Sequence, residues 1–139
     1  MQADKTQAVI YCRIAAATTA DSFAMENQRQ NLYRFAESKG YEITAEYLDK
    51  GVSGVTMDRP SFARLNNDML AGRVSTVLVA SGSRIGRETH AVVEWLNNAE
   101  SLGIDVVSVH DDLSGYKFYS SFISELVKLS KRPRQPTIR

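Results

Sequence analysis

The stretch Ala8-Val-Ile-Tyr-Cys-Arg-Ile-Ala15 decides the fold, because an apolar, β-favouring run ends here in an arginine and small, polar residues follow. This pattern is typical of a buried parallel strand that opens into a loop. In an open α/β sheet, ligands bind at the carboxyl ends of the strands, which is where Arg13 lies. Side chains alternate across a strand, so position 15 is expected on the same side as Arg13. Ala15 therefore stands where an attacking side chain would be expected.

The composition is that of one globular domain. The chain has 139 residues, of which 43% are hydrophobic, enough for a core that buries roughly two thirds of the unfolded surface. A net charge of +1 does not by itself indicate nucleic-acid binding. The lone Cys12 is expected to be a small core residue in a reducing compartment. No apolar run approaches about 18 residues, and residues 1–7 lack the apolar core of a secretory signal, so a cytoplasmic protein without a membrane partner is expected.

The rest of the chain alternates between predicted strands and predicted helices. Strands are expected at residues 8–14, 43–48, 74–80 and 105–109. Helices are expected at residues 22–39, 60–71, 88–102 and 118–131. Loops are expected at residues 15–21, 50–58 and 81–87. This alternation predicts a three-layer α/β domain with a mostly parallel central sheet flanked by helices.

Four arginines are expected at one edge of this sheet. Arg13 ends the first predicted strand, and Arg59 follows the loop after the second. Arg84 and Arg87 lie in the loop after the third strand. Arginine forks match phosphate oxygens in bidentate geometry, so a cluster of them could hold a phosphodiester and stabilise charge that develops at phosphorus. The alternative is that these are scattered surface arginines, each solvated or paired with an acid.

Four motifs, in this order, resemble those of the resolvase/invertase serine recombinase catalytic domain. They are Tyr11-Cys-Arg-Ile-Ala15, Glu26-Asn-Gln-Arg29, Asp49-Lys-Gly-Val-Ser-Gly54 with Asp58-Arg-Pro60, and Ser83-Arg-Ile-Gly-Arg87. The resemblance covers about residues 8–112. It implies a resolvase-like fold and site-specific DNA recombination: a serine attacks the scissile phosphate and becomes linked to the 5′ end, then subunits exchange and the strands rejoin. The resemblance implies no metal and no other cofactor.

The resemblance also implies roles for individual residues. The residues that would surround the phosphate are Arg13, Arg59, Arg84 and Arg87. Those that would support the site, or the loop over it, are Gln28, Asp49, Ser53 and Ser83. Residues 1–115 would form the catalytic core, and the apolar helix at 116–131 would form the subunit interface. Large exposed apolar patches usually mark such interfaces.

Residues 132–139 are rich in basic residues and proline and are expected to form a flexible tail. Together with the end of the preceding helix it carries cations that could grip DNA backbone phosphate. They are Lys131, Arg132, Arg134 and Arg139. Members of the family continue through a long helix into a separate DNA-binding domain, whereas here the short basic tail follows the helix.

Ala15 is the main departure from the family pattern, which has the nucleophilic serine at this position. A methyl group cannot attack phosphorus, so strand cleavage is expected to be absent. Ser83 is a second departure, because many relatives carry aspartate there. As substitutes for the nucleophile, Cys12 has the wrong parity on its strand, and Thr18 and Thr19 have no evident activating base. The sequence leaves open whether Ala15 is natural or engineered.

Three functions remain open. The first is a recombinase domain without cleavage activity, which would bind DNA, form a homodimer or higher oligomer through residues 116–131, and pair with an active recombinase. The second is a non-catalytic DNA-binding or assembly module of a mobile element. The third is a small α/β domain of the flavodoxin or receiver type. The receiver type is disfavoured because it requires paired acids at the end of the first strand, where Arg13-Ile-Ala15 stands. Nucleotide-binding folds are disfavoured because no glycine-rich phosphate loop follows that strand.

Overall fold

The computed structural model describes residues 5–14, 19–51 and 59–130. Within these ranges, strands and helices alternate along the chain. The strands are β1 (Thr6–Ile14), β2 (Tyr41–Lys50), β3 (Thr76–Val79) and β4 (Asp105–Ser108). The helices are α1 (Thr19–Lys39), α2 (Pro60–Leu70), α3 (Gly82–Ile85), α4 (Thr89–Ser101) and α5 (Ser114–Ser130). The predicted α/β class is confirmed.

The described strands form one parallel sheet in the order β2-β1-β3-β4. β1 is a central strand, and its residues from Ala8 to Ile14 are all buried. This explains why the run from Ala8 to Cys12 is apolar without interruption, since a strand covered on both faces has no polar side. In the register of β1 and β2, Arg13 lies opposite Asp49. The carboxyl ends of these two strands are therefore level at one edge of the sheet.

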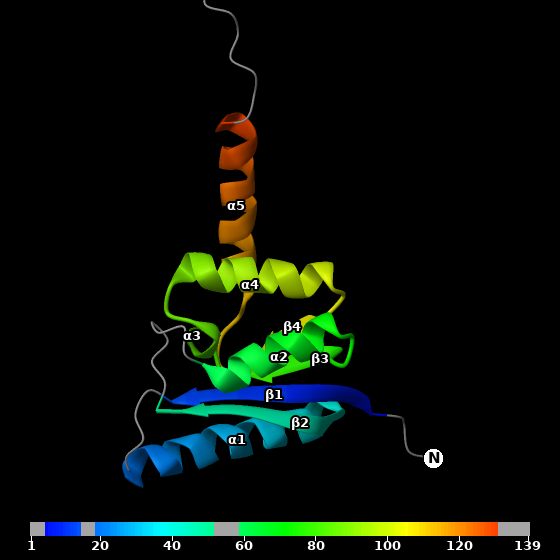
Figure 1. The fold of residues 1–139 in the computed structure, drawn as a ribbon, viewed down its shortest axis with the longest axis vertical. Helices are drawn as coiled ribbons and strands as arrows, with labels where there is room; N and C mark the ends of the chain where they lie inside the picture. The colour runs from blue at the N-terminus through cyan, green and yellow to red at the C-terminus, as the bar shows by residue number, and fades with distance from the viewer. Residues whose placement is uncertain (1–4, 15–18, 52–58, 131–139) are drawn as a thin grey trace, which may run out of the picture.

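Helices cover both faces of the sheet (Figure 1). On one face, Ile10 and Cys12 pack in a core cluster with Leu32 of α1. On the other, Val9 and Tyr11 pack in a second cluster with residues of α2 and α4. Successive β1 side chains point to opposite faces, which gives Arg13 the parity of Tyr11. The arginine therefore lies on the side of the sheet covered by α2 and α4.

α5 stands away from the sheet, and only its first part lies against α4 (Figure 1). Tyr116, in its first turn, packs against the core cluster under α2 and α4. The last residues of the helix, 125–130, are exposed. α5 is thus joined to the rest of the domain through its amino-terminal end.

Two element predictions were wrong. The predicted loop at 81–87 contains the one-turn helix α3, and the last helix begins at Ser114 rather than at residue 118 or 116. Gly115 lies inside α5, because Asp112 accepts hydrogen bonds from the backbone N–H and the hydroxyl of Ser114 and so caps the helix before the glycine. Most of the predicted loop at 50–58, and the tail at 132–139, lie outside the described residues.

Candidate functional site

Three of the four predicted arginines converge at the carboxyl edge of the sheet. Arg13 Nε donates to the backbone carbonyl of Arg84 at 3.2 Å, and Arg13 Nη2 donates to that of Ser83 at 2.6 Å. Arg59 Nη2 donates to the same Arg84 carbonyl at 3.0 Å, and its Nη1 to the carbonyl of Ile85. In return, Arg84 Nη1 donates to the carbonyl of Arg13 at 2.9 Å. The end of β1, the start of α2 and the helix α3 are therefore linked through guanidinium groups.

These cations are held close together and largely away from water. Arg13 is 3% exposed and Arg59 is 9% exposed. Burial lowers the pKa of Arg13, and the positive charges of Arg59, Arg84 and Arg87 lower it further. Arg87 itself is exposed but lies within electrostatic reach of the others. We call these four residues the arginine cluster; it is a concentration of positive charge at the predicted edge.

One donor in the arginine cluster has no acceptor. Among the side chains of the described residues, the Nε–H of Arg84 is buried and makes no hydrogen bond. A buried donor without a partner costs about 1–3 kcal/mol, so nearly all such groups in folded proteins are satisfied. An anionic oxygen bound at this position would satisfy it.

The hydroxyl of Tyr11 orients Arg59. It donates to Asp49 Oδ2 at 2.7 Å and accepts from Arg59 Nε at 3.2 Å and Nη2 at 2.9 Å. Burial raises the pKa of Tyr11, and its bond to the Asp49 carboxylate raises it further. The guanidinium of Arg59 also lies over the ring of Phe62, 3.9 Å from its centroid. Sequence reasoning missed this role of Tyr11, and the signal that could have indicated it is that Tyr11 lies on the same side of β1 as Arg13.

The predicted supporting residues occupy different parts of this site. Gln28, from α1, holds the backbone of Arg13: its Oε1 accepts from the Arg13 N–H at 3.1 Å and its Nε2 donates to the Arg13 carbonyl at 3.2 Å. Asp49 accepts the backbone N–H groups of Ser61 and Phe62 at 2.9 and 3.0 Å, which caps α2. The Ser83 hydroxyl lies 2.7 Å from that of Ser81, at the entrance to α3.

Several predicted residues lie outside the described parts of the chain. They are Ala15, Ser53, Lys131, Arg132, Arg134 and Arg139. Cys12 is described, and it points toward α1, away from Arg13, as its parity predicted. Burial raises the pKa of its thiol to about 12, so it is not a thiolate near neutral pH.

Two further properties concern metals and membranes. In the parts of the chain that the structure describes, no group of three or more His, Cys, Asp or Glu side chains is arranged to hold a metal ion. None of the helices in these ranges is long and apolar enough to cross a membrane.

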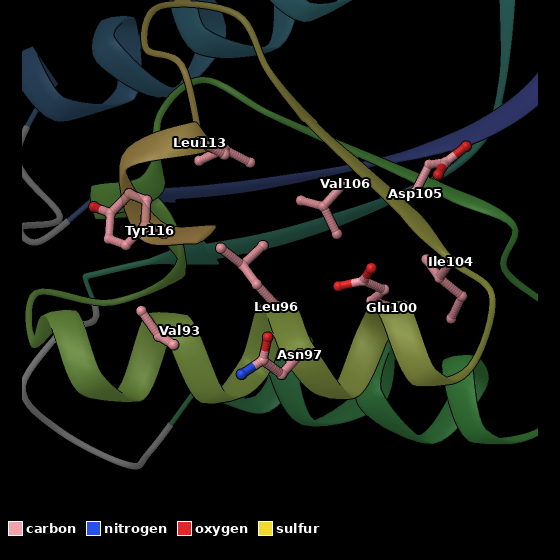
Figure 2. Close-up of a pocket in the computed structure, with 9 residues that line it drawn as sticks. All are labelled: Val93, Leu96, Asn97, Glu100, Ile104, Asp105, Val106, Leu113 and Tyr116. Carbon is pink, nitrogen blue, oxygen red and sulfur yellow. The ribbon is translucent and has the colours of Figure 1, made fainter. Parts of the chain in front are cut away.

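A cavity of about 130 Å³ lies between α4, β4 and the start of α5 (Figure 2). Its lining combines apolar side chains with the amide of Asn97 and the carboxylates of Glu100 and Asp105. No member of the arginine cluster lines it, so this cavity is separate from the candidate site. Tyr116 forms one of its walls.

Comparison with known proteins identifies the arrangement. The family model described as the resolvase N-terminal domain matches residues 8–131. The N-terminal catalytic domain of TP901-1 integrase is 25% identical in sequence and superposes with a TM-score of 0.76, over 91% of this chain and 97% of that chain. A resolvase family site-specific recombinase from Streptococcus pneumoniae is 27% identical, with a TM-score of 0.70 over 91% and 93% of the two chains. No curated protein matches the sequence.

A third structure shares the fold at lower identity. It is the C-terminal catalytic domain of ISC1926 TnpA, an IS607-like serine recombinase, which is 22% identical with a TM-score of 0.67 over 88% of this chain and 82% of that one. The family match covers the described sheet except the first two residues of β1, and it includes every member of the arginine cluster. The chain therefore belongs to the resolvase family of serine recombinases, and residues 8–131 correspond to the N-terminal domain of that family.

Proposed function

We propose that this chain binds a DNA phosphodiester at the arginine cluster, as the catalytic-type domain of a site-specific recombination protein. The observation that carries the proposal is the buried Arg84 Nε–H, which has no acceptor and lies among other cations. A phosphodiester oxygen would supply both the missing acceptor and the missing negative charge. Membership of the resolvase family supports DNA as the source of that phosphate.

The cluster is suited to hold a charged group in a fixed position. Arg13 and Arg59 are anchored by backbone carbonyls of residues 83–85. A carbonyl has no net charge, so these bonds fix the guanidinium groups without neutralising them. Donors that are fixed before a ligand binds stabilise developing charge without reorganising. In this proposal Gln28, Asp49, Ser53 and Ser83 support the arginines or the loop next to them.

Cleavage is absent in this proposal, because Ala15 has no atom that can attack phosphorus. The chain would retain phosphate binding without forming a covalent link to DNA. Making Ala15→Ser tests this directly. The variant and the unmodified protein are incubated with a random-sequence pool of short DNA duplexes, and covalent adducts are separated on a denaturing gel and sequenced.

An adduct formed only by Ala15→Ser supports a recombinase domain that lacks its nucleophile. An adduct formed by both proteins would mean that another residue attacks, and would overturn the proposed inactivity. If neither protein forms one, the binding measurement that follows decides between a DNA-binding role and none.

Binding at the arginine cluster is tested with a short mixed-sequence duplex at fixed salt. Arg84→Ala should weaken binding about tenfold or more, because a charge-assisted contact to phosphate is lost. Arg73→Ala is the matched control, since Arg73 is an exposed arginine that pairs with Asp68. Arg73 lies just before β3, at the end of the strand opposite to the arginine cluster. Equal losses in the two variants would mean that the effect is one of net charge, and that the cluster is not the site.

The tail would add contacts to the DNA backbone through Lys131, Arg132, Arg134 and Arg139. Each phosphate neutralised contributes about 0.9 to the slope of log binding constant against log salt. Replacing all four residues by alanine should therefore flatten that slope by up to about 3.6. An unchanged slope would exclude the tail from the interface.

A second candidate function is favoured by α5. In the proposed division of the chain, residues 1–115 bind the phosphate and residues 116–131 pair with another subunit. Leu126, Val127 and Leu129 are 45%, 41% and 55% exposed on this helix, although all three are apolar. A chain that pairs but cannot cleave would regulate an active recombinase by forming mixed dimers. Mixing it with an active family member should then lower the recombination rate in proportion to the fraction of mixed dimers.

A further inference from the structure

The segment between β4 and α5 holds the first residue of α3. The backbone N–H of Gly82 donates to both carboxylate oxygens of Asp111, at 3.3 and 3.2 Å. The ring of Tyr116 lies against the same glycine: a Cβ placed on Gly82 would be 2.6–2.9 Å from three atoms at the far end of that ring. The side chains of Asp111 and Tyr116, about 30 residues further along the chain, thus both contact Gly82, which directly precedes Ser83.

α3 depends on contacts of this kind. It is a single turn from Gly82 to Ile85, closed by the bonds from Arg84 N–H to the Ser81 carbonyl at 3.1 Å and from Gly86 N–H to the Gly82 carbonyl at 3.4 Å. A turn this short is not stable by itself, because the cost of nucleating a helix exceeds what one or two hydrogen bonds return. Contacts from outside the turn therefore determine its conformation.

Asp111 is in turn fixed to the sheet. Its Oδ1 accepts a hydrogen bond from the hydroxyl of Ser108, at the end of β4. The neighbouring His110 N–H donates to the carbonyl of Ala80 at 2.9 Å, at the end of β3. The carboxylate is thus held at the carboxyl edge of two strands, where it can act as a rigid support for Gly82.

We propose that Asp111 and Tyr116 are positioning residues of the arginine cluster. By holding Gly82, they fix α3, and α3 carries both the Arg84 side chain and the carbonyls that orient Arg13 and Arg59. Their effect on DNA rests on the proposed function, since they act through α3 and not on phosphate directly. Because Tyr116 belongs to α5, a shift of the base of α5 would be transmitted to Arg84.

The carboxylate is tested with Asp111→Ala, and Asp105→Ala is the matched control. Asp105 is an exposed carboxylate on the same strand-to-helix unit, at the opposite end of β4. Asp111→Ala should speed amide hydrogen exchange at Arg84 and Gly86, measured by NMR, and weaken duplex binding about fivefold, the effect of losing one helix cap. Exchange at Ile10 in β1 should not change, which checks that the fold is intact.

The ring is tested with a cycle of Gly82→Ala, Tyr116→Ala and the double variant. Gly82 does not have a positive φ, so alanine fits its backbone and the variant tests space alone. The added methyl must displace the tyrosine ring, and the cavity beside Tyr116 gives the ring room to turn (Figure 2). Each single variant should therefore speed exchange at Arg84 to a similar degree.

The double variant should be no worse than Tyr116→Ala alone, because the ring that the methyl displaces is already gone. Tyr116→Phe keeps the ring and should behave as the unmodified protein. Additive losses in the double variant, or unchanged exchange at Arg84 and Gly86 in Asp111→Ala and Tyr116→Ala, would overturn the proposal.

The two proposals fail in different ways. If Arg84→Ala binds duplex as tightly as the unmodified protein, the proposed function fails, while the exchange measurements still decide whether α3 is positioned by Asp111 and Tyr116. If Arg84→Ala weakens binding but neither positioning variant changes binding or exchange, the function stands and the positioning role is wrong.

Discussion

At the carboxyl edge of the sheet, the hydroxyl of Tyr11 links the carboxylate of Asp49 to the buried guanidinium of Arg59. It donates a hydrogen bond to Asp49 and accepts two hydrogen bonds from Arg59. Tyr11→Phe should lower the free energy of unfolding by about 1–3 kcal/mol, because two buried partners lose a hydrogen bond. Urea denaturation measures this.

Tyr41→Phe is the control for that measurement. The ring of Tyr41 stacks on Phe35, with centroids 6.5 Å apart, and its substitution leaves the cluster intact. A change of under about 0.5 kcal/mol is expected there. Similar decreases in the free energy of unfolding in both variants would show that the Tyr11 hydroxyl does not contribute more to stability than that of Tyr41.

Cys12 gives a prediction about alkaline pH. Burial raises the pKa of its thiol from 9.0 to about 12. Between these values the unfolded chain releases the proton and the folded chain keeps it, so the folded state binds more protons and stability falls as the pH rises. Cys12→Ala should reduce this fall between about pH 9 and pH 12, by up to about 1.4 kcal/mol per pH unit. Urea denaturation at several pH values checks it, and equal slopes with and without the thiol would contradict it. Tyr47, whose pKa is also raised to about 12, leaves a residual slope.

At the scale of elements, α2 is held at its start by a residue of β2. Asp49 accepts hydrogen bonds from the backbone N–H groups of Ser61 and Phe62. The N-cap residue of α2 itself makes no side-chain hydrogen bond of this kind. Asp49→Ala should lower the free energy of unfolding by about 1–3 kcal/mol and weaken duplex binding, because Arg59 directly precedes the helix. Thermal denaturation followed by circular dichroism measures the first effect. Asp105→Ala, an exposed carboxylate, should change little.

The elements themselves were largely predictable, because a buried strand and an amphipathic helix each leave a periodic pattern. α3 was missed because four residues cannot display a period. The predicted start of α5 is too late because a glycine such as Gly115 is unfavourable inside a helix. The cap from Asp112 to Ser114 begins the helix before that glycine, and such a cap depends on geometry more than on composition.

At the scale of the molecule, the meeting of the arginines was predictable from topology alone. In a parallel sheet every strand ends at the same edge, so residues after three different strands meet there. Their partners were not predictable. Arg13 and Arg59 bind backbone carbonyls of residues 83–85, and a carbonyl leaves no mark in the sequence.

α5 carries the prediction about assembly. Replacing Leu126 and Leu129 by lysine should abolish the proposed pairing of two chains through α5, because charge would enter the apolar contact that this pairing requires. Sedimentation velocity over a range of concentrations measures this. Leu70→Lys is the control, since Leu70 is an equally apolar residue, 72% exposed at the end of α2. If the control disrupts assembly and the α5 variant does not, the interface lies elsewhere.

The central position of β1 has a consequence for synthesis on the ribosome. This strand is translated before both of the strands that flank it, at residues 41–50 and 77–79. Parallel strands cannot pair through a tight turn, so the seven consecutive buried positions from Ala8 to Ile14 cannot be covered until residues 77–79 have been translated. Until then the apolar side chains of β1 are exposed, and a chaperone would be expected to shield this segment.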